Sequence, residues 1–579
     1  MSRNDLETIT TDILIVGAGG AGLRAAIAAA DAGMTIIVAG KSMLGKCHTV
    51  MAEGGINASL GNIDPQDNWK VHAADTIREG QFLNDPRMVE ILAKEATDII
   101  WELESWGCLF DRTPEGKIMQ RAFGGHTFRR TCHIGDHTGL EIMQTLMAEV
   151  RRRERITTMD EVIMTKLLTT ATAVAGAIGL NLRTGNAYVI KSKAIILATG
   201  GCGRVYRVST NPLETIGDGC FLAYHAGAEL MDMEMVQFHP TGMLHPKTAE
   251  GILVTESVRG EGGILLNGLG ERFMKNYDPI RMELSTRDVV SRAIFTEIRE
   301  GRGTAHNRQG GVWLDITHKG KAFIEKKLPK MVKQFKDFAS VDITKEKMEV
   351  APTAHYTMGG VRGHAETGAT SVTGLYAVGE IAAGVHGANR LGGNSLTDIL
   401  VFGRRAGRAA AAYAKRTTHA HLPQKQIAKE LRRLFEPFTR KKGARPHVLR
   451  EKIQDLMWKH AGIFRTQKGL TAALKQLQQL RKQTMQVQGS RRYNPEWATY
   501  LDVNCMLLTC NAIIRSALER RESRGAHARE DYPNKDDNHW LMNIILFKDR
   551  NGMQLKRMPV PPSTLELARV SEEAPNERQ

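Results

Sequence analysis

Five separate polar segments carry the side chains with the clearest chemical potential. Each combines His, Arg, Glu or Thr with glycine or other loop residues, and together they are Gln237–Gly242, Thr255–Gly262, Thr286–Arg292, His355–Gly360 and Gly387–Leu396. Guanidinium groups and imidazoles bind carboxylates through charge-assisted hydrogen bonds, and sites are commonly built on loops. The set suits a substrate with two carboxylates, whose carbon–carbon bond could change oxidation state given a hydride carrier and a proton donor.

The start of the chain supplies a place for such a carrier. An apolar run over residues 12–16 leads into the turn Gly17-Ala18-Gly19-Gly20-Ala21-Gly22, and a helix is predicted over residues 23–32. Gly17 permits the tight turn, Gly19 lets the backbone approach a pyrophosphate, and Gly22 lets the helix pack closely on the strand. The helix N-terminus would then offer free N–H groups to the phosphates. The pattern predicts a dinucleotide site; a glycine turn that serves packing alone is the alternative.

An acidic residue is expected after the second strand of such a unit, to bind the ribose hydroxyls. That strand is predicted over residues 35–38, yet Gly40-Lys41-Ser42 follows it. Two later apolar runs, 194–201 and 374–380, suit the ends of buried parallel strands, where ligands collect. Glu380 ends the second of these runs and is the candidate for the missing acid.

The segment from Lys46 to Gly55 places a lone histidine, His48, beside a small-residue loop just after the dinucleotide motif. That combination indicates a flavin attached through a covalent bond. An ordinary loop histidine is the alternative.

Residues 10–60 and the five polar segments, in this order, resemble the flavoprotein subunits of succinate dehydrogenases and fumarate reductases. The resemblance implies that His48 carries FAD on its 8α-methyl carbon, although Cys47 stands where serine is more usual. Ile216, before Asp218, likewise replaces a frequent threonine. The other flavin-binding residues that the resemblance implies, beside the glycines of the turn, are Lys41, Ser42, Thr49, Gly54, Gly55, Asp218, Glu380, Asn389, Ser395 and Leu396.

The resemblance also implies the catalytic roles. His239, Thr255, His355 and Arg390 would bind the two carboxylates, and Arg287 would exchange a proton with the substrate. Glu256 and Arg259 would connect Arg287 to solvent. A pure electrostatic clamp is the alternative for Arg287, because a pKa above about 12 makes neutral arginine scarce.

The expected fold is α/β, with a split Rossmann-like FAD-binding domain, an inserted α+β capping domain and a C-terminal helical domain. The FAD-binding domain is predicted over residues 1–240 and 351–413, the capping domain over 241–350, the helical domain over 414–535 and a C-terminal segment over 536–579. Closing of the cap is expected to expel water and to bring Arg287 to the substrate.

Charge is uneven along the 579 residues, whose formal net charge is +16. Residues 424–485 contain sixteen Lys or Arg against four Asp or Glu, at spacings typical of amphipathic helices. A solvated basic face is the plainest interpretation, and docking to an acidic partner or a lipid surface is the other. Few aromatic residues and no reader motif disfavour nucleic-acid binding.

Seven cysteines without a CxxC pair predict no metal site and no iron–sulfur cluster in this chain, so a cluster is expected on another subunit. No apolar run reaches the eighteen or more residues of a membrane span, and the first residues lack a secretory or twin-arginine signal. A cytoplasmic location is therefore expected. The resemblance adds peripheral attachment to the inner face of the cytoplasmic membrane, through membrane anchors that bind quinone and through an iron–sulfur subunit.

The favoured function is therefore interconversion of succinate and fumarate by hydride transfer to or from FAD. A soluble fumarate reductase or an L-aspartate oxidase, which hold FAD without a covalent link, is one alternative, and a non-catalytic flavin-binding interaction subunit is another. Glu53, where many succinate dehydrogenases have glutamine, favours fumarate reduction. The sequence leaves open the working direction and the electron donor, quinone or thiol.

Overall fold

The computed structural model describes residues 6–171, 173–304 and 310–562. Its centre is a seven-stranded sheet in the order β6-β2-β1-β9-β8-β7, with β16 paired to β9 as well. Strands β6, β2, β1, β9 and β16 run parallel, whereas β8 and β7 form an antiparallel edge. The bounds are β1 Leu6–Val16, β2 Ile36–Ala39, β6 Ile156–Met159, β7 Val162–Thr169, β8 Val174–Asn181, β9 Ala187–Leu197 and β16 Leu375–Ala377. The arrangement confirms the predicted Rossmann-like sheet.

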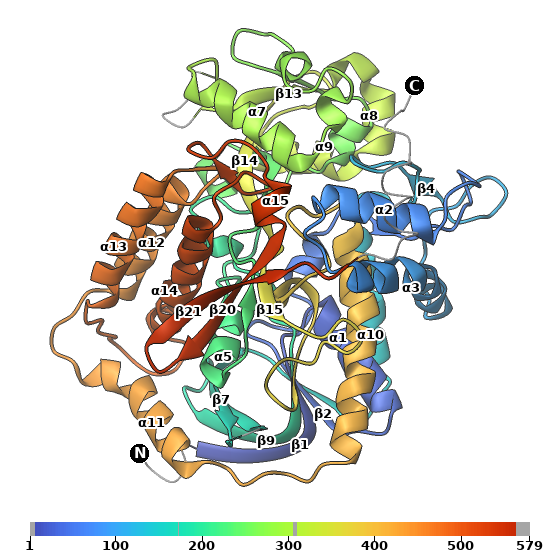
Figure 1. Cartoon of the computed structure of the whole chain (residues 1–579). Coiled ribbons are helices and arrows are strands. Elements are labelled where there is room, and N and C mark those ends of the chain that lie inside the picture. Colours follow the sequence, from blue (N-terminus) through green and yellow to red (C-terminus); the bar gives the residue numbers. More distant parts are fainter. Residues whose placement is uncertain (1–5, 172, 305–309, 563–579) are drawn as a thin grey trace.

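Helices cover this sheet and bring the two halves of the flavin unit together. Helix α1 (Gly20–Asp31) packs against α10 (Asn394–Lys415), which comes from the second half of the chain (Figure 1). A Cβ added at Gly407 would lie 2.3 Å from the Ala25 carbonyl oxygen, so glycine permits this close approach. The remaining helices of the unit are α2 Trp69–Glu79, α3 Pro86–Ser105, α4 Thr138–Arg151 and α5 Asp218–Ala226, and a small sheet contains β3 Ile56–Asn57, β4 Gln120–Arg121 and β5 Thr131–Cys132.

The capping unit lies at the top of the molecule in Figure 1. Its four-stranded antiparallel sheet has the order β11-β14-β13-β12, with helices around a separate apolar core. The elements are β11 Val236–Met243, α6 Ser257–Gly260, β12 Ile264–Leu266, α7 Arg287–Arg299, β13 Val312–Asp315, α8 Lys321–Lys327, α9 Pro329–Ala339 and β14 Met348–Thr357. The predicted boundaries at 240 and 350 fall inside β11 and β14, so these paired strands run from one unit into the other.

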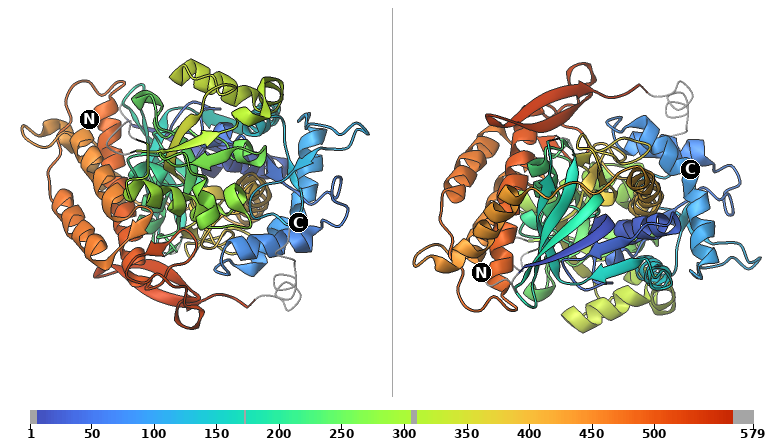
Figure 2. Two further views of the ribbon diagram at one scale, coloured as in Figure 1. Left: turned by 90° about the horizontal axis from the view of Figure 1, so that it is seen from above. Right: turned by 90° about the horizontal axis from the view of Figure 1, so that it is seen from below.

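Four helices form the helical unit on one flank of the molecule (Figures 1 and 2). They are α11 Gln424–Phe435, α12 Pro446–His460, α13 Gln467–Arg481 and α14 Pro495–Glu519. Within the described residues, α14 alone is long and apolar enough to pass a membrane-span test by length and composition. It packs against α12, α13 and α5, and 61% of the tested window is buried, as expected for a core helix of the domain.

The C-terminal segment returns to the flavin unit. Strands β20 (Met542–Asp549) and β21 (Gly552–Pro559) follow the short helix α15 (Asp537–Trp540) and form a hairpin. Strand β20 pairs with β10 in a five-stranded sheet, whose other members are β21, β15 and β17. The bounds are β10 Leu230–Met231, β15 Gly360–Arg362 and β17 Ala382–Ala383, and a two-stranded sheet pairs β18 Phe464–Arg465 with β19 Ala528–Arg529. Residues 563–579 of the predicted segment lie outside the described residues.

Candidate active site

One cavity of about 1610 Å³, counting the space at its open mouth, joins the glycine turn to the charged segments. It lies between the flavin unit and the capping unit. Of the predicted site residues, those that line it are Gly17, Gly19, Gly20, Lys41, Ser42, His48, Thr49, Gly54, Gly55, Asp218, His239, Thr255, Glu256, Arg287, His355, Glu380, Arg390, Ser395 and Leu396. Residues far apart in sequence therefore share one space, which runs from the glycine turn to the charged segments.

The glycine turn has the geometry that the motif predicts. Gly17 has a φ of +116°, and a Cβ there would lie 2.1 Å from the Ala198 carbonyl oxygen. A Cβ on Gly22 would lie 1.9 Å from the Gly17 carbonyl oxygen, so α1 sits directly on the turn. Gly19 caps α1 in extended conformation, and no acidic residue occupies the first helical turn. The positive end of α1 therefore faces the cavity, ready for phosphate oxygens.

Lys41 stands where an acid is usual and is itself held by acids. Its Nζ lies 2.7 Å from Asp502 Oδ1 and 3.7 Å from Asp218 Oδ2. Burial would lower the pKa of Lys41, but Asp502 and Asp218 raise it overall, so the ammonium stays charged. Glu380 accepts a hydrogen bond of 3.0 Å from the Thr357 amide. Burial raises the pKa of Glu380 to about 7.

His48 begins the short 3-10 helix η2 (His48–Met51) in the cavity wall. Asn211 Nδ2 donates to its Nε2 at 3.2 Å, and its buried Nδ1 has no hydrogen-bond partner among the described residues. Burial, with the charges of Arg390 and Arg204, lowers the pKa of His48 to about 4. The imidazole is neutral at physiological pH and can act as a nucleophile.

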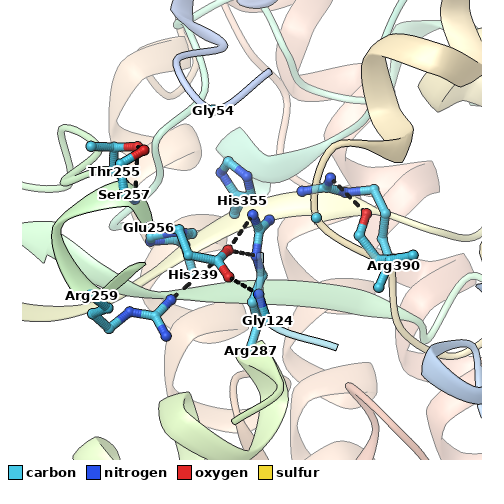
Figure 3. Close-up of polar contacts among 12 residues, drawn as sticks. Gly54, Gly124, His239, Thr255, Glu256, Ser257, Arg259, Arg287, His355 and Arg390 are labelled. Atoms are coloured by element: carbon cyan, nitrogen blue, oxygen red, sulfur yellow. Dashed lines mark hydrogen bonds and ion pairs between the residues drawn. The ribbon is translucent and has the colours of Figure 1, made fainter. Parts of the chain in front are cut away.

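The charged end of the cavity is built around one carboxylate, shown in Figure 3. Arg287, the first residue of α7, donates from Nε and Nη2 to Glu256 Oε2 at 2.9 and 2.8 Å. Arg259 Nη2 lies 3.9 Å from the same oxygen, and the Gly124 amide donates to the other. Burial would raise the pKa of Glu256, but Arg287 and Arg259 hold it well below its usual range. Before any proton transfer, Glu256 is therefore an anion between two guanidinium groups.

Two neutral histidines face each other beside this pair. The ring centroids of His239 and His355 are 5.1 Å apart. His239 Nδ1 lies 3.0 Å from the Thr241 carbonyl oxygen, and His355 Nδ1 lies 2.8 Å from Thr210 Oγ1. Burial lowers both pKa values well below the usual range; Arg287 adds to the effect on both rings. The rings are oriented hydrogen-bonding groups rather than cations.

Arg390 completes the site from the other half of the flavin unit. Its guanidinium carbon lies 4.4 Å from the centroid of the Tyr356 ring, and Nη1 lies 3.4 Å from Ser395 Oγ. Burial and the charge of Arg287 lower the pKa of Arg390 to about 9. Gln237 Oε1 accepts 3.2 Å hydrogen bonds from both Arg287 and Arg390. One amide oxygen therefore fixes the spacing between the two cations.

Three predicted residues do not line the cavity. Gly22 lies beneath the turn, and Arg259 lies behind Glu256. Asn389, predicted to shape the flavin pocket, is buried behind Gln237, which donates to its Oδ1 at 2.7 Å. Its amide nitrogen donates to the carboxylates of Glu79 and Asp288, at 2.7 and 3.0 Å. These acids draw the amide away from the cavity, so Asn389 supports the arginine pair instead.

Sequence reasoning assigned no role to Gln237 or Tyr356. Gln237 lies two residues before His239 on β11, and residues two apart on a strand share a face. That period could have placed Gln237 in the site, whereas nothing in the sequence indicates the stacking of Tyr356 on Arg390.

Among the described residues, no group of three or more His, Cys, Asp and Glu side chains could hold a metal ion.

Comparison with known proteins agrees with this geometry. Residues 12–396 match the family described as FAD binding domain, and residues 450–579 match the fumarate reductase flavoprotein C-terminal family. The chain is 47% identical to a subunit of the fumarate reductase (CoM/CoB) of Methanothermobacter marburgensis, over 93% of this chain and 97% of that protein. It is 38% identical to the succinate dehydrogenase flavoprotein subunit of Rickettsia bellii, over 96% of each.

Solved structures give the same result. Mycobacterium smegmatis Sdh1 in complex with UQ1 superposes with a TM-score of 0.89 at 42% identity, covering 98% of this chain and 97% of that one. A quinol-fumarate reductase with menaquinol molecules superposes with a TM-score of 0.92 at 35% identity, covering 96% and 99%. The match spans every unit of the fold, from the glycine turn to the helical unit, and the chain belongs to the succinate dehydrogenase and fumarate reductase flavoprotein family.

Proposed function

We propose that this chain is the catalytic flavoprotein subunit of a complex that interconverts succinate and fumarate. The observation that carries the proposal is the cavity that joins the glycine turn to the cluster of Arg287, Glu256, His239, His355 and Arg390. A dicarboxylate there meets cationic and hydrogen-bonding groups on several sides. A proton donor and a dinucleotide pocket lie within the same space.

The protein groups in the cavity fit FAD. The turn has no room for a side chain at Gly17, and the N-terminus of α1 offers amide donors to a diphosphate. Lys41, Asp218 and Glu380 are charged residues of the cavity wall that are available to the rest of the dinucleotide. When bound, FAD supplies the hydride acceptor or donor of the reaction.

Binding of the substrate falls to His239, Thr255, His355 and Arg390. Arginine binds a carboxylate in a forked arrangement, and the neutral imidazoles contribute oriented hydrogen bonds. Because these groups are fixed before the substrate arrives, they need no rearrangement when negative charge develops on it.

Arg287 carries the proton. In the reducing direction the carbon–carbon π bond of fumarate breaks, one carbon gains a hydride, and its neighbour takes a proton from the Arg287 guanidinium. Glu256, at 2.8 Å, is placed to return a proton to Arg287, and Arg259 continues the chain beyond Glu256. Loss of the Arg287 charge removes the main interaction that keeps Glu256 ionised, so Glu256 can then take up a proton from the Arg259 side and pass it to Arg287.

The covalent attachment of FAD to His48 is part of the proposal. Its support is the neutral, buried imidazole in the cavity wall, whose Nε2 carries the lone pair that accepts from Asn211. Acid-denatured protein on a gel should retain flavin fluorescence, and His48→Ser should lose it. Flavin fluorescence that stays with denatured His48→Ser protein would show that His48 is not the attachment site.

Electrons are proposed to pass to or from an iron–sulfur subunit, and through membrane anchor subunits to a quinone pool. The chain would then sit peripherally on the inner face of the cytoplasmic membrane. Support comes from relatives whose solved structures include UQ1 or menaquinol. Purification from the native source tests this step, since a cluster-bearing chain should copurify. The electron donor could be a quinol or a thiol, since the Methanothermobacter relative is named for CoM and CoB. Fumarate reduction assayed with a quinol and, separately, with CoM and CoB distinguishes the two donors.

Viologen-linked fumarate reduction and dye-linked succinate oxidation by the isolated chain test the catalytic proposal. Turnover with these acids supports it, whereas oxidation of aspartate with formation of peroxide would favour the L-aspartate oxidase alternative.

A further inference from the structure

Glu53 is a buried carboxylate in the wall of the cavity, in the loop between η2 and β3. Its residue is 3% exposed. Oε1 lies 2.7 Å from Lys330 Nζ, and Oε2 has no hydrogen-bond partner among the described residues. A buried anion with one such contact depends heavily on that contact.

Lys330 belongs to the capping unit, as the second residue of α9 (Pro329–Ala339). Its backbone amide donates to Asp136 Oδ2 at 2.9 Å, and Asp136 is buried in the flavin unit. The first turn of α9 is therefore held by two acids of the other unit. Acids at a helix N-terminus also interact favourably with its dipole.

The opposite side of the cap has separate attachments. On α7, Arg292 donates to the Gly525 carbonyl oxygen and Arg299 pairs with Glu530. Both partners follow α14 in the chain. The capping unit therefore contacts the rest of the chain at two separate places, through α9 and through α7. Glu53 takes part only in the contact at α9.

The charged groups around Glu53 are few. Arg121 donates to the carbonyl oxygens of Glu53 and Gly54 rather than to the Glu53 carboxylate, and Asp136 adds a negative charge nearby. Burial raises the pKa of Glu53 to about 7, with Lys330 and then Arg121 opposing the rise and Asp136 adding to it. The carboxylate is therefore ionised above about pH 7 and neutral below.

We propose that Lys330 is a positioning residue, which latches the capping unit onto the flavin unit through the ionised Glu53. Closing the cap without Lys330 would bury an unpaired carboxylate, which is costly. The ion pair should be present at pH 8, where Glu53 is ionised; because closing buries Glu53 and raises its pKa, protonation at lower pH reduces the cost of closing. Its effect on catalysis rests on the proposed function; the latch itself is independent of substrate.

Hydrogen–deuterium exchange of α9 tests the latch directly, on the full chain as purified and without substrate. Lys330→Gln should raise exchange of α9 several-fold at pH 8, and Lys330→Arg should restore slow exchange. Lys333→Gln is the matched control, because Lys333 is exposed on the same helix. Equal exchange in Lys330→Gln and the unsubstituted protein, or an equal rise in the control, would overturn the proposal.

Glu53→Gln supplies the second half of a double-mutant cycle. In its background Lys330→Gln should change exchange far less, because no charge is left to pair. Additive effects of the two substitutions would rule out the latch.

Kinetics then connect the latch to the site. Lys330→Gln should raise the KM for fumarate several-fold while kcat falls less, because the cap closes around the substrate less often. An unchanged KM alongside loosened α9 would overturn the link to catalysis. Absence of fumarate reduction in the unsubstituted protein would instead defeat the proposed function, and exchange would still decide the latch.

Discussion

Arg287 donates two hydrogen bonds to a single oxygen of Glu256, at 2.9 and 2.8 Å, while both side chains are buried. The arrangement leaves Arg287 Nη1 bonded to the Gln237 amide, next to Arg390. A guanidinium held on both sides in this way has one orientation. Orientation is what a proton donor to carbon requires.

Arg287→Ala should lower turnover by about 10²- to 10⁴-fold, the usual contribution of a positioned proton donor. Binding of a dicarboxylate should persist, because His239, His355 and Arg390 remain. Viologen-linked fumarate reduction measures the first effect, and titration with an unreactive dicarboxylate measures the second. Turnover close to normal would leave Arg287 as an electrostatic clamp only.

The ring of Tyr356 stacks on the guanidinium group of Arg390, whose carbon lies 4.4 Å from the ring centroid. A desolvated cation–π contact contributes about 2 kcal/mol. Tyr356→Leu should therefore raise the KM for fumarate by about tenfold or more. Tyr356→Phe keeps the ring and serves as the matched control, although it loses the 3.1 Å contact to His386. Equal effects of the two substitutions would show that the hydroxyl, not the ring, supports Arg390.

Gly22 and Gly19 should fail in different ways when changed to alanine. A Cβ at Gly22 would lie 1.9 Å from a backbone oxygen, whereas at Gly19 the nearest protein atom would be 3.7 Å away. Gly22→Ala should therefore destabilise the fold itself. Gly19→Ala should fold normally but lose flavin, because its methyl group occupies space that the diphosphate needs. Thermal unfolding and the flavin-to-protein ratio separate the outcomes, and full flavin content in Gly19→Ala would contradict the assigned phosphate position.

Much of this site could be predicted from the sequence, because the motifs are local. A glycine turn between a strand and a helix specifies its own backbone geometry, as Gly17 and Gly22 show. The catalytic side chains were predicted from separate segments, and the structure brings His239, His355 and Arg390 into one cavity.

The remaining features depend on contacts between distant segments, which local patterns do not specify. Lys41 meets Asp502 of the helical unit, and Lys330 of the cap meets Glu53. Asn389 was predicted in the flavin pocket, but Glu79 and Asp288 hold it behind Gln237. The pairing of β20 with β10 is equally distant, since it joins the end of the chain to the flavin unit.

His72 should make the protein sensitive to acid. It is fully buried, its Nε2 lies 2.8 Å from Asn394 Oδ1, and Asn394 begins the helix that follows the Arg390 loop. Burial, with the charge of Arg130, lowers the pKa of His72 to about 3. The unfolded chain takes up the proton near the usual value of about 6.5. Stability from this group is therefore present above pH 6.5 and is lost as the pH falls toward 3.

His72→Gln keeps a donor for Asn394 but removes the titration. Between pH 6 and pH 5 the unsubstituted protein should lose about 1 kcal/mol more free energy of unfolding than the variant does. Urea titrations at the two pH values measure the difference. His447→Gln is the matched control, since His447 is exposed on α12, and it should follow the unsubstituted protein. If His72→Gln loses as much stability on acidification as the control, His72 does not take up a proton on unfolding, and its role is confined to the hydrogen bond that fixes Asn394.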